Sequence, residues 1–284
     1  MLPIGHTDAI NSVSYSPDGK YIVTSSFDNG IKLWESRTGQ LLYSKEGYEY
    51  SYASACFSND GKYILFSRLN TQAFANDYAK ILETSTGKIL HSFTGKILSA
   101  KFSPDGKYLV AVSLDKTVKV WESLTGKLLY PLEAYTQYFD INNIVSFSND
   151  SKYIATISLF DTTVKVWESS SGKLIHSLKG HTKKILSVSF SPDGKCITST
   201  SRDTSIMVWD SYTGKLLHSL EGYSANFSPD GKYIVTESYG STVKVWENYS
   251  GKLLYTLERQ SDWNIFSANK KCKFSPDGKY IVTA

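Results

Sequence analysis

The chain has 284 residues, and its content of 41% hydrophobic and 20% charged residues is typical of a globular protein with a sizeable core. A formal net charge of +4 without any Lys/Arg-rich run argues against a dedicated nucleic-acid binder, which usually carries a basic patch or stripe. The N-terminus lacks the basic and apolar regions of a signal peptide, and no apolar run approaches the roughly 20 residues that span a bilayer, so we expect a cytoplasmic protein with no membrane partner.

The first predicted elements set a pattern that the rest of the chain repeats. An alternating segment leads into the turn Ser-Pro-Asp-Gly-Lys at residues 16–20, a second apolar segment follows, and a third ends at Trp34. A Thr-Gly turn at residues 38–39 then leads to a fourth segment. Pro fixes one backbone angle of such a turn and Gly accepts a positive one, so the pattern predicts four short strands joined by tight turns.

The same turn motif, Ser-Pro/Asn-Asp-Gly/Ser-Lys, recurs along the whole chain at intervals of 37 to 47 residues. Its copies begin at Ser16, Ser58, Ser103, Ser148, Ser191, Ser228 and Ser275. An interval near 40 residues is what four strands and their turns need. We therefore expect a single domain over residues 1–284, with repeats at residues 1–46, 47–94, 95–133, 134–179, 180–221, 222–258 and 259–284.

A second motif, Thr-Val-Lys-Val-Trp-Glu or a variant of it, ends the third segment of each of the first six repeats. Leu82 takes the Trp position in the second repeat, and the others have Trp34, Trp121, Trp167, Trp209 and Trp246. The alternating segments and the 20 Tyr residues favour strands over helices. One four-stranded sheet cannot bury both of its faces alone, so we expect each sheet to be covered by its neighbours.

Together these motifs resemble the WD40 repeat family over essentially the whole chain. Two repeats carry the Gly-His pair of that family, Gly5-His6 and Gly180-His181, and one carries its Trp-Asp pair, Trp209-Asp210. The resemblance implies an all-β, WD40-type β-propeller of seven repeats, with six complete four-stranded blades and a seventh truncated after its second strand. For the open seventh blade we expect one of three explanations: missing sequence of a longer protein, completion by another chain, or a tolerated gap.

The resemblance also implies structural tetrads in the first and fifth repeats. Their members are His6, Thr24, Asp28 and Trp34, and His181, Ser199, Asp203 and Trp209. A Ser-His-Asp catalytic triad is the competing interpretation, but a buried, fully satisfied hydrogen-bond network is the one we favour. Other repeats depart from the pattern, with Ala111 at the hydroxyl position, Phe66 and Leu82 in the second repeat, and Gly240 at the Asp position. We therefore expect the first and fifth blades to be the best ordered.

Partner binding is expected on loops that the strands hold in place. The resemblance implies a ring of contact residues, made from the residue before each turn Asp and from the start of each first strand. These candidates are Phe27, Leu114, Phe160, Arg202 and Tyr239 at the turns, and Asn11, Leu98, Asn143, Lys184, Leu186, Tyr223 and Lys270 at the strand starts. Apolar and aromatic residues beside Arg and Lys suit a protein interface, and Lys184, Arg202 and Lys270 favour an acidic or phosphorylated segment.

No cofactor or metal is expected. Cys56, Cys196 and Cys272 are far apart and lack zinc-ligand spacing, so we interpret them as free buried thiols. His91, His176 and His218 occupy equivalent positions in different repeats, too far apart to share an ion. The repeated Thr-Gly-Lys turn lacks the frame of a phosphate-binding loop.

We therefore expect a non-catalytic scaffold or adaptor that holds other proteins or peptide segments. The alternatives are the regulatory or sensor portion of a larger multidomain signalling protein, and a propeller hydrolase, which would need three or more convergent acidic residues. Nucleic acid is the least favoured partner because no basic stripe is present.

Overall fold

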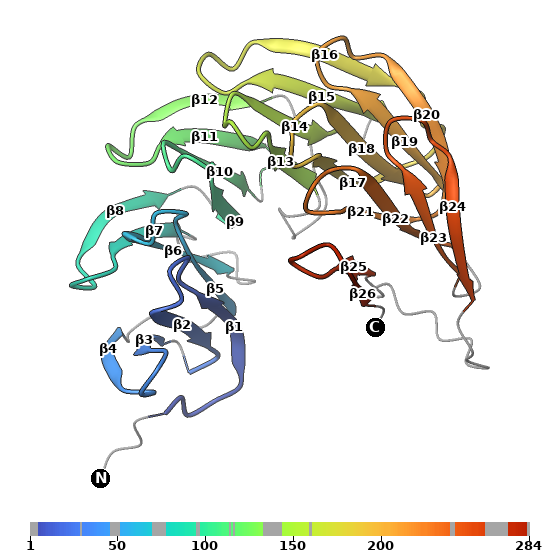
Figure 1. The fold of residues 1–284 in the computed structure, drawn as a ribbon. Coiled ribbons are helices and arrows are strands. Elements are labelled where there is room, and N and C mark those ends of the chain that lie inside the picture. The colour runs from blue at the N-terminus through green and yellow to red at the C-terminus, as the bar shows by residue number, and fades with distance from the viewer. Residues whose placement is uncertain are drawn as a thin grey trace. The chain divides into compact units, whose positions relative to one another are not determined.

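The computed structural model (Figure 1) forms two compact units, the first of residues 1–133 and 137–141 and the second of residues 134–136 and 142–284. The residues that the structure describes are 5–28, 30–45, 52–69, 78–94, 97–113, 115, 117–132, 144–158, 161–238, 242–258 and 272–282.

The first unit contains three four-stranded antiparallel sheets, one for each of the first three repeats. The first sheet has the order β1 (Ile10–Tyr15), β2 (Tyr21–Ser26), β3 (Ile31–Glu35) and β4 (Leu41–Lys45). The second is β5 (Tyr52–Phe57), β6 (Tyr63–Leu69), β7 (Tyr78–Glu83) and β8 (Ile89–Thr94). The third is β9 (Ile97–Phe102), β10 (Tyr108–Ser113), β11 (Val118–Glu122) and β12 (Leu128–Leu132).

The second unit contains three more sheets of the same order and a two-stranded sheet. The fourth sheet is β13 (Val145–Phe147), β14 (Tyr153–Ile157), β15 (Thr163–Glu168) and β16 (Leu174–Lys179). The fifth is β17 (Ile185–Phe190), β18 (Cys196–Ser201), β19 (Ser205–Asp210) and β20 (Leu216–Glu221). The sixth is β21 (Ser224–Phe227), β22 (Tyr233–Glu237), β23 (Thr242–Glu247) and β24 (Leu253–Glu258), and the seventh repeat contributes β25 (Lys273–Phe274) and β26 (Ile281–Val282).

This strand order confirms the prediction of an all-β chain with six complete four-stranded sheets and a two-stranded seventh. The turn motif explains the tightness of the first hairpin in each sheet. In the first repeat the Ser16 hydroxyl donates to Asp18 Oδ1 at 2.7 Å and accepts from the Tyr21 N–H at 2.9 Å. Gly19 follows with a φ of +70°, which an L side chain adopts only under strain. The Ser, Asp and Gly of the motif therefore each have a structural role.

Within each unit, apolar core clusters lie between adjacent sheets. Val23 and Leu33 of the first sheet pack with Phe57 and Ile64 of the second, and Val208 of the fifth sheet belongs to one cluster with residues of the sixth. In the four-stranded sheets most of the second strand is buried on both faces, as the pattern of β18 shows, whereas most of β20 is exposed or half-buried. Because its neighbours cover it, each sheet can hold polar groups inside the second and third strands.

Candidate functional site

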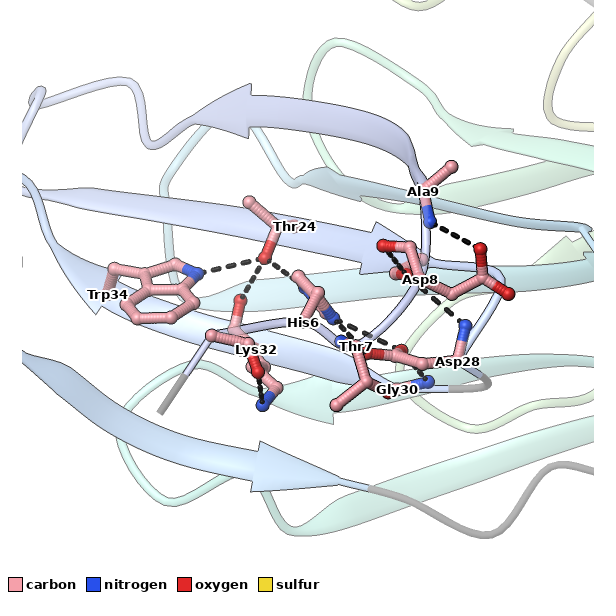
Figure 2. A network of polar contacts seen from close by, with 11 residues as sticks. His6, Thr7, Asp8, Ala9, Thr24, Asp28, Gly30, Lys32 and Trp34 are labelled. Carbon is pink, nitrogen blue, oxygen red and sulfur yellow. Dashed lines mark hydrogen bonds and ion pairs between the residues drawn. The ribbon is translucent and has the colours of Figure 1, made fainter. Parts of the chain in front are cut away.

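The first sheet contains a chain of hydrogen bonds that links all four predicted tetrad residues (Figure 2). Trp34 Nε1 donates to Thr24 Oγ1 at 2.8 Å, and Thr24 Oγ1 lies 2.7 Å from His6 Nε2. The other ring nitrogen, His6 Nδ1, lies 2.9 Å from Asp28 Oδ2. The chain thus runs from the third strand through the second to the loop before β1 and back to the turn after β2.

The direction of the donors follows from the chemistry of the groups. The indole N–H can only donate, so the Thr24 oxygen accepts it and its single proton goes to the nearer acceptor. That acceptor is His6 Nε2 at 2.7 Å rather than the Lys32 carbonyl at 3.4 Å. We therefore assign a neutral imidazole with its proton on Nδ1, donated to Asp28.

Asp28 is the anchor of the loop before β1. Its carboxylate accepts the Thr7 N–H at 2.8 Å and the Gly30 N–H at 2.9 Å in addition to the His6 ring. Burial raises the pKa of this carboxyl, but the hydrogen bonds from Thr7, His6 and Gly30 outweigh burial and hold the pKa below its ordinary value. An ionised Asp28 therefore joins the loop to the turn after β2.

The fifth sheet repeats this arrangement with Ser in place of Thr. Trp209 Nε1 donates to Ser199 Oγ at 2.9 Å, Ser199 Oγ lies 2.8 Å from His181 Nε2, and His181 Nδ1 lies 3.0 Å from Asp203 Oδ2. Asp203 also accepts the N–H and hydroxyl of Ser205. Burial raises the pKa of Asp203. The hydrogen bonds from Ser205, the Thr182 N–H and His181 outweigh burial and hold this pKa well below its ordinary value.

The connectivity of Ser199, His181 and Asp203 is that of a catalytic triad, so accessibility distinguishes the two interpretations. Ser199 has 0% exposure in the middle of β18, and the Trp209 N–H occupies a lone pair of its oxygen. A nucleophile must reach a substrate carbonyl, and this hydroxyl lies beneath the sheet surface. The geometry therefore fits a structural network.

The remaining sheets keep only parts of the tetrad. Trp167 donates to Thr156 at 2.8 Å in the fourth sheet, and Trp246 donates to Thr236 at 2.9 Å in the sixth. In the third sheet, where Ala111 offers no hydroxyl, the Trp121 ring packs edge-on against Phe93 with 5.7 Å between ring centroids. In the second sheet Phe66 takes the hydroxyl position and Leu82 takes the Trp position, and both apolar side chains are buried.

A lysine two residues before the Trp position is a feature that the sequence analysis missed. It is present in five sheets, as Lys32, Lys80, Lys119, Lys165 and Lys244, whereas the fifth sheet has Met207. Lys119 Nζ lies 2.8 Å from Asp115, and Lys165 Nζ lies 5.8 Å from the centre of the Trp167 ring.

The Asp115 carboxyl shows the effect of this lysine. Burial raises its pKa, but the hydrogen bonds from Lys119 and Thr117 outweigh burial and lower it to about 2. In the third sheet a lysine thus partners the turn carboxylate that a histidine holds in the first and fifth. The recurring Lys in the Val-Lys-Val-Trp motif was the signal for this feature.

The described members of the predicted contact ring lie at the tetrad end of their sheets. Arg202 N–H donates to the Lys184 carbonyl at 2.9 Å, and Phe27 N–H donates to the Ala9 carbonyl at 3.0 Å, so in the first and fifth sheets the loop before the first strand meets the turn after the second. Asn11 and Arg202 are exposed, and Phe27, Lys184, Leu186 and Tyr223 are half-buried. Leu98 is placed by its backbone in β9. Leu114, Asn143, Phe160, Tyr239 and Lys270 lie outside the described residues.

The cysteines and outer-strand histidines take structural positions. Burial raises the pKa of the Cys56, Cys196 and Cys272 thiols to about 11, which suppresses thiolate reactivity. His176 Nε2 lies 2.9 Å from the Tyr212 carbonyl of the next sheet, and His218 makes the same contact with Asn248 at 3.0 Å. Among the described residues no group of three or more His, Cys, Asp and Glu side chains could hold a metal ion, and no helix could cross a membrane.

Comparisons with known proteins agree with this geometry. A family model described as WD domain, G-beta repeat matches residues 2–35, 87–122, 126–168, 172–210 and 214–247. Protein groucho of Drosophila melanogaster is 26% identical over 156 residues, which cover 54% of this chain and 20% of that protein. COMPASS component SWD3 of Saccharomyces cerevisiae is 27% identical over 134 residues, covering 43% of this chain and 41% of that protein.

A guanine nucleotide-binding protein subunit beta of Zea mays is 32% identical over 126 residues, covering 41% of this chain and 33% of that protein. The matched part of the chain therefore spans less than half the length of each of these three relatives.

Proposed function

Because the chain belongs to the WD40 repeat family, we propose that it is a non-catalytic scaffold or adaptor that holds other proteins or peptide segments on the loops at the tetrad end of its β-propeller blades. The observation that carries this proposal is the anchoring of those loops. Asp203 joins the Thr182 N–H, the His181 ring and Ser205, so the loop before β17 and the turn after β18 form one rigid surface. Rigid loops bind partners without losing much conformational entropy.

The chemistry of this surface in the fifth repeat favours an acidic or phosphorylated segment. Lys183 and Arg202 are exposed and Lys184 is half-buried, and Arg202 and Lys184 are joined through their backbones at 2.9 Å. The neighbouring Asp203 accepts hydrogen bonds from His181 and from the Thr182 N–H, both in the loop before β17. A guanidinium beside ammonium groups binds carboxylate or phosphate through charge-assisted hydrogen bonds.

A matched pair of double variants tests the proposal. Lys184→Ser with Arg202→Ser removes two positive charges from the tetrad end of the fifth sheet, and Lys195→Ser with Lys215→Ser removes two from the opposite end. We expect affinity capture of partner proteins to be lost in the first double variant and retained in the second. Equal capture by both variants would overturn the proposed location, and circular dichroism checks that both are folded.

A second candidate is the regulatory or sensor portion of a larger signalling protein, which the greater length of the three relatives favours. It uses the same loop surface but places the partner within the same polypeptide. We propose a cytoplasmic location for either role. A hydrolase role is less favoured because Ser199 is fully buried.

A further inference from the structure

The opposite end of the sheets, where the first and third turns lie, contains a feature that the scaffold role does not use. At the junctions of the first and second, the fifth and sixth, and the sixth and seventh sheets, the Pro of one turn motif lies against the turn Gly of the next sheet. A methyl group placed on Gly61 would lie 3.5 Å from Pro17 Cδ, and one placed on Gly231 would lie 3.7 Å from Pro192 Cδ. These proline rings therefore fill the space between adjacent turns.

Two junctions depart from this arrangement. Between the second and third sheets Asn59 Nδ2 donates to the Pro104 carbonyl at 2.9 Å, and a methyl group placed on Gly106 would meet no neighbouring atom within 4 Å. Between the fourth and fifth sheets the change is the same. Asn149 replaces Pro, and its Nδ2 donates to the Pro192 carbonyl of the next turn at 3.1 Å. A methyl group placed on Gly194 would meet no neighbouring atom within 4 Å. Because Asn149 has an amide in place of the proline ring, and this amide donates to the Pro192 carbonyl, open space remains above Gly194.

A pocket of about 320 Å³ lies at this junction. Its lining consists of Ser148, Asn149, Asp150, Tyr153, Asp193, Gly194 and Tyr212. All of these belong to the first turns of the fourth and fifth sheets, the start of β14 and the third turn of the fifth sheet. Two acidic residues and two tyrosines therefore line one small pocket.

The junction of the fifth and sixth sheets shows which donor satisfies the carboxylate of a first turn. Between the fifth and sixth sheets the Tyr249 hydroxyl donates to Asp193 Oδ2, so an aromatic donor from the neighbouring sheet satisfies that carboxylate. By repeat position Tyr212 corresponds to Tyr249, and Asp150 corresponds to Asp193. Tyr212 instead has 66% of its surface exposed and lines the pocket. The Tyr249 phenol therefore closes the junction of the fifth and sixth sheets. At the junction of the fourth and fifth sheets the corresponding Tyr212 is exposed to solvent.

The two acidic residues of the lining favour a cation, and because Asp193 already accepts the Tyr249 hydroxyl, Asp150 is the main carboxylate for a cation in this pocket. Burial raises the pKa of Asp150 and of Asp193, but hydrogen bonds from Ser148 and Ser191 respectively, among others, outweigh burial, and both carboxyls are ionised at neutral pH. Lys152 Nζ lies 3.3 Å from Asp150 in an exposed ion pair, which contributes little and is readily exchanged. Tyrosine faces add a cation–π attraction.

We propose that this pocket binds the guanidinium group of an arginine side chain presented by a partner protein. A guanidinium is planar, donates in parallel to carboxylates and stacks on aromatic rings, whereas an ammonium group offers a point charge alone. The pocket and the contact ring lie at opposite ends of the strands, so this binding is independent of the scaffold surface.

The test is a titration of the full chain with N-acetyl-L-arginine amide, followed by NMR shifts of the Gly194 amide and the Tyr212 ring. We expect saturable shifts with a dissociation constant on the order of millimolar, the range of a single side chain. The citrulline analogue, which has the same shape without the charge, should give no saturable shift. The lysine analogue should bind more weakly than arginine.

Asn149→Pro restores the usual turn and fills the pocket, and Asn59→Pro makes the same change at the junction of the second and third sheets. We expect the first variant to weaken arginine binding by at least about tenfold and the second to leave it unchanged. Tyr212→Ser installs the residue type that Ser170 has at the equivalent position of the fourth sheet. This variant should weaken arginine binding without filling the open space above Gly194.

Absence of saturable shifts, equal binding of the citrulline analogue, or undiminished binding in the Asn149→Pro variant would each overturn the proposal. The Lys184→Ser, Arg202→Ser double variant should bind arginine normally, which keeps this result separate from the test of the scaffold role.

Discussion

The fifth and second sheets fill the same interior positions by opposite means. In the fifth sheet Trp209, Ser199 and His181 form a buried polar chain that ends on Asp203. In the second sheet the corresponding interior is apolar, with Phe66 and Leu82 buried. Both sheets have four strands in the same order. The strand pairing therefore does not require the polar chain.

This comparison indicates what the polar chain contributes to the fifth sheet. A buried network contributes little net stability once desolvation is counted, but it fixes the orientation of the groups at its ends. In the fifth sheet those ends are the loop before β17 and the turn after β18, where the proposed partner surface lies. Packing of Phe66 and Leu82 stabilises the second sheet but does not fix the orientation of a loop at its end.

The largest expected effect comes from giving the second sheet one part of the polar chain. Phe66→Ser removes a large buried ring and buries a hydroxyl with no tetrad partner, so we expect a loss of about 4 kcal/mol or more in unfolding free energy. Chemical denaturation measures it. A loss below about 1 kcal/mol would mean that the second sheet tolerates polar groups as the fifth does.

Removing the central hydroxyl of the fifth sheet should cost less. Ser199→Ala leaves the Trp209 N–H and His181 Nε2 without their partner, and we expect a loss of about 2 kcal/mol. Ser199→Thr is the control, because Thr24 performs this role in the first sheet, and it should cost less than about 1 kcal/mol. Equal losses in the two variants would show that volume rather than hydrogen bonding matters at this position.

The Asp203 carboxylate, at the end of the hydrogen-bond network of the fifth sheet, should make the stability of the protein depend on pH. The pKa of Asp203 is lowered on folding from an ordinary value of 3.8, so its contribution is fully present above that value and is lost as the pH falls further. The denaturant midpoint of the parent chain should decrease from pH 5 to pH 2. Asp203→Asn should lower the midpoint at pH 7 and flatten this decrease, and an unchanged slope would contradict the assignment.

The smallest effect concerns the lysine that the fifth sheet lacks. Lys119→Met installs in the third sheet the residue type of Met207 and breaks the ion pair with Asp115, which is partly exposed. We expect a loss of at most about 1 kcal/mol that diminishes at high salt. A salt-independent loss above that value would mean that Lys119 acts through packing.

The fold was predictable from the sequence because each repeat carries its own turn residues, and Pro17, Gly19 and Trp34 mark three of its elements. The tetrad positions were predictable for the same reason, since their spacing follows the repeat. Of the contact ring, Arg202 and Asn11 are exposed, and the binding role of the whole ring stays a prediction.

Contacts between repeats could not be predicted in this way. The open space above Gly194 depends on Asn149 of the preceding repeat, and the Tyr249–Asp193 hydrogen bond joins residues 56 positions apart in sequence. A motif within one repeat does not specify the distance to the next sheet. The Asn in two of the seven turn motifs was visible, but its effect on packing required the structure.

The most direct test of the central claim is hydrogen–deuterium exchange of the full chain with and without a captured partner. We expect binding to protect the amides of residues 181–186 and 202–205, at the tetrad end of the fifth sheet. Protection confined to residues 191–195 and 211–215, at the opposite end of the same sheet, would contradict it.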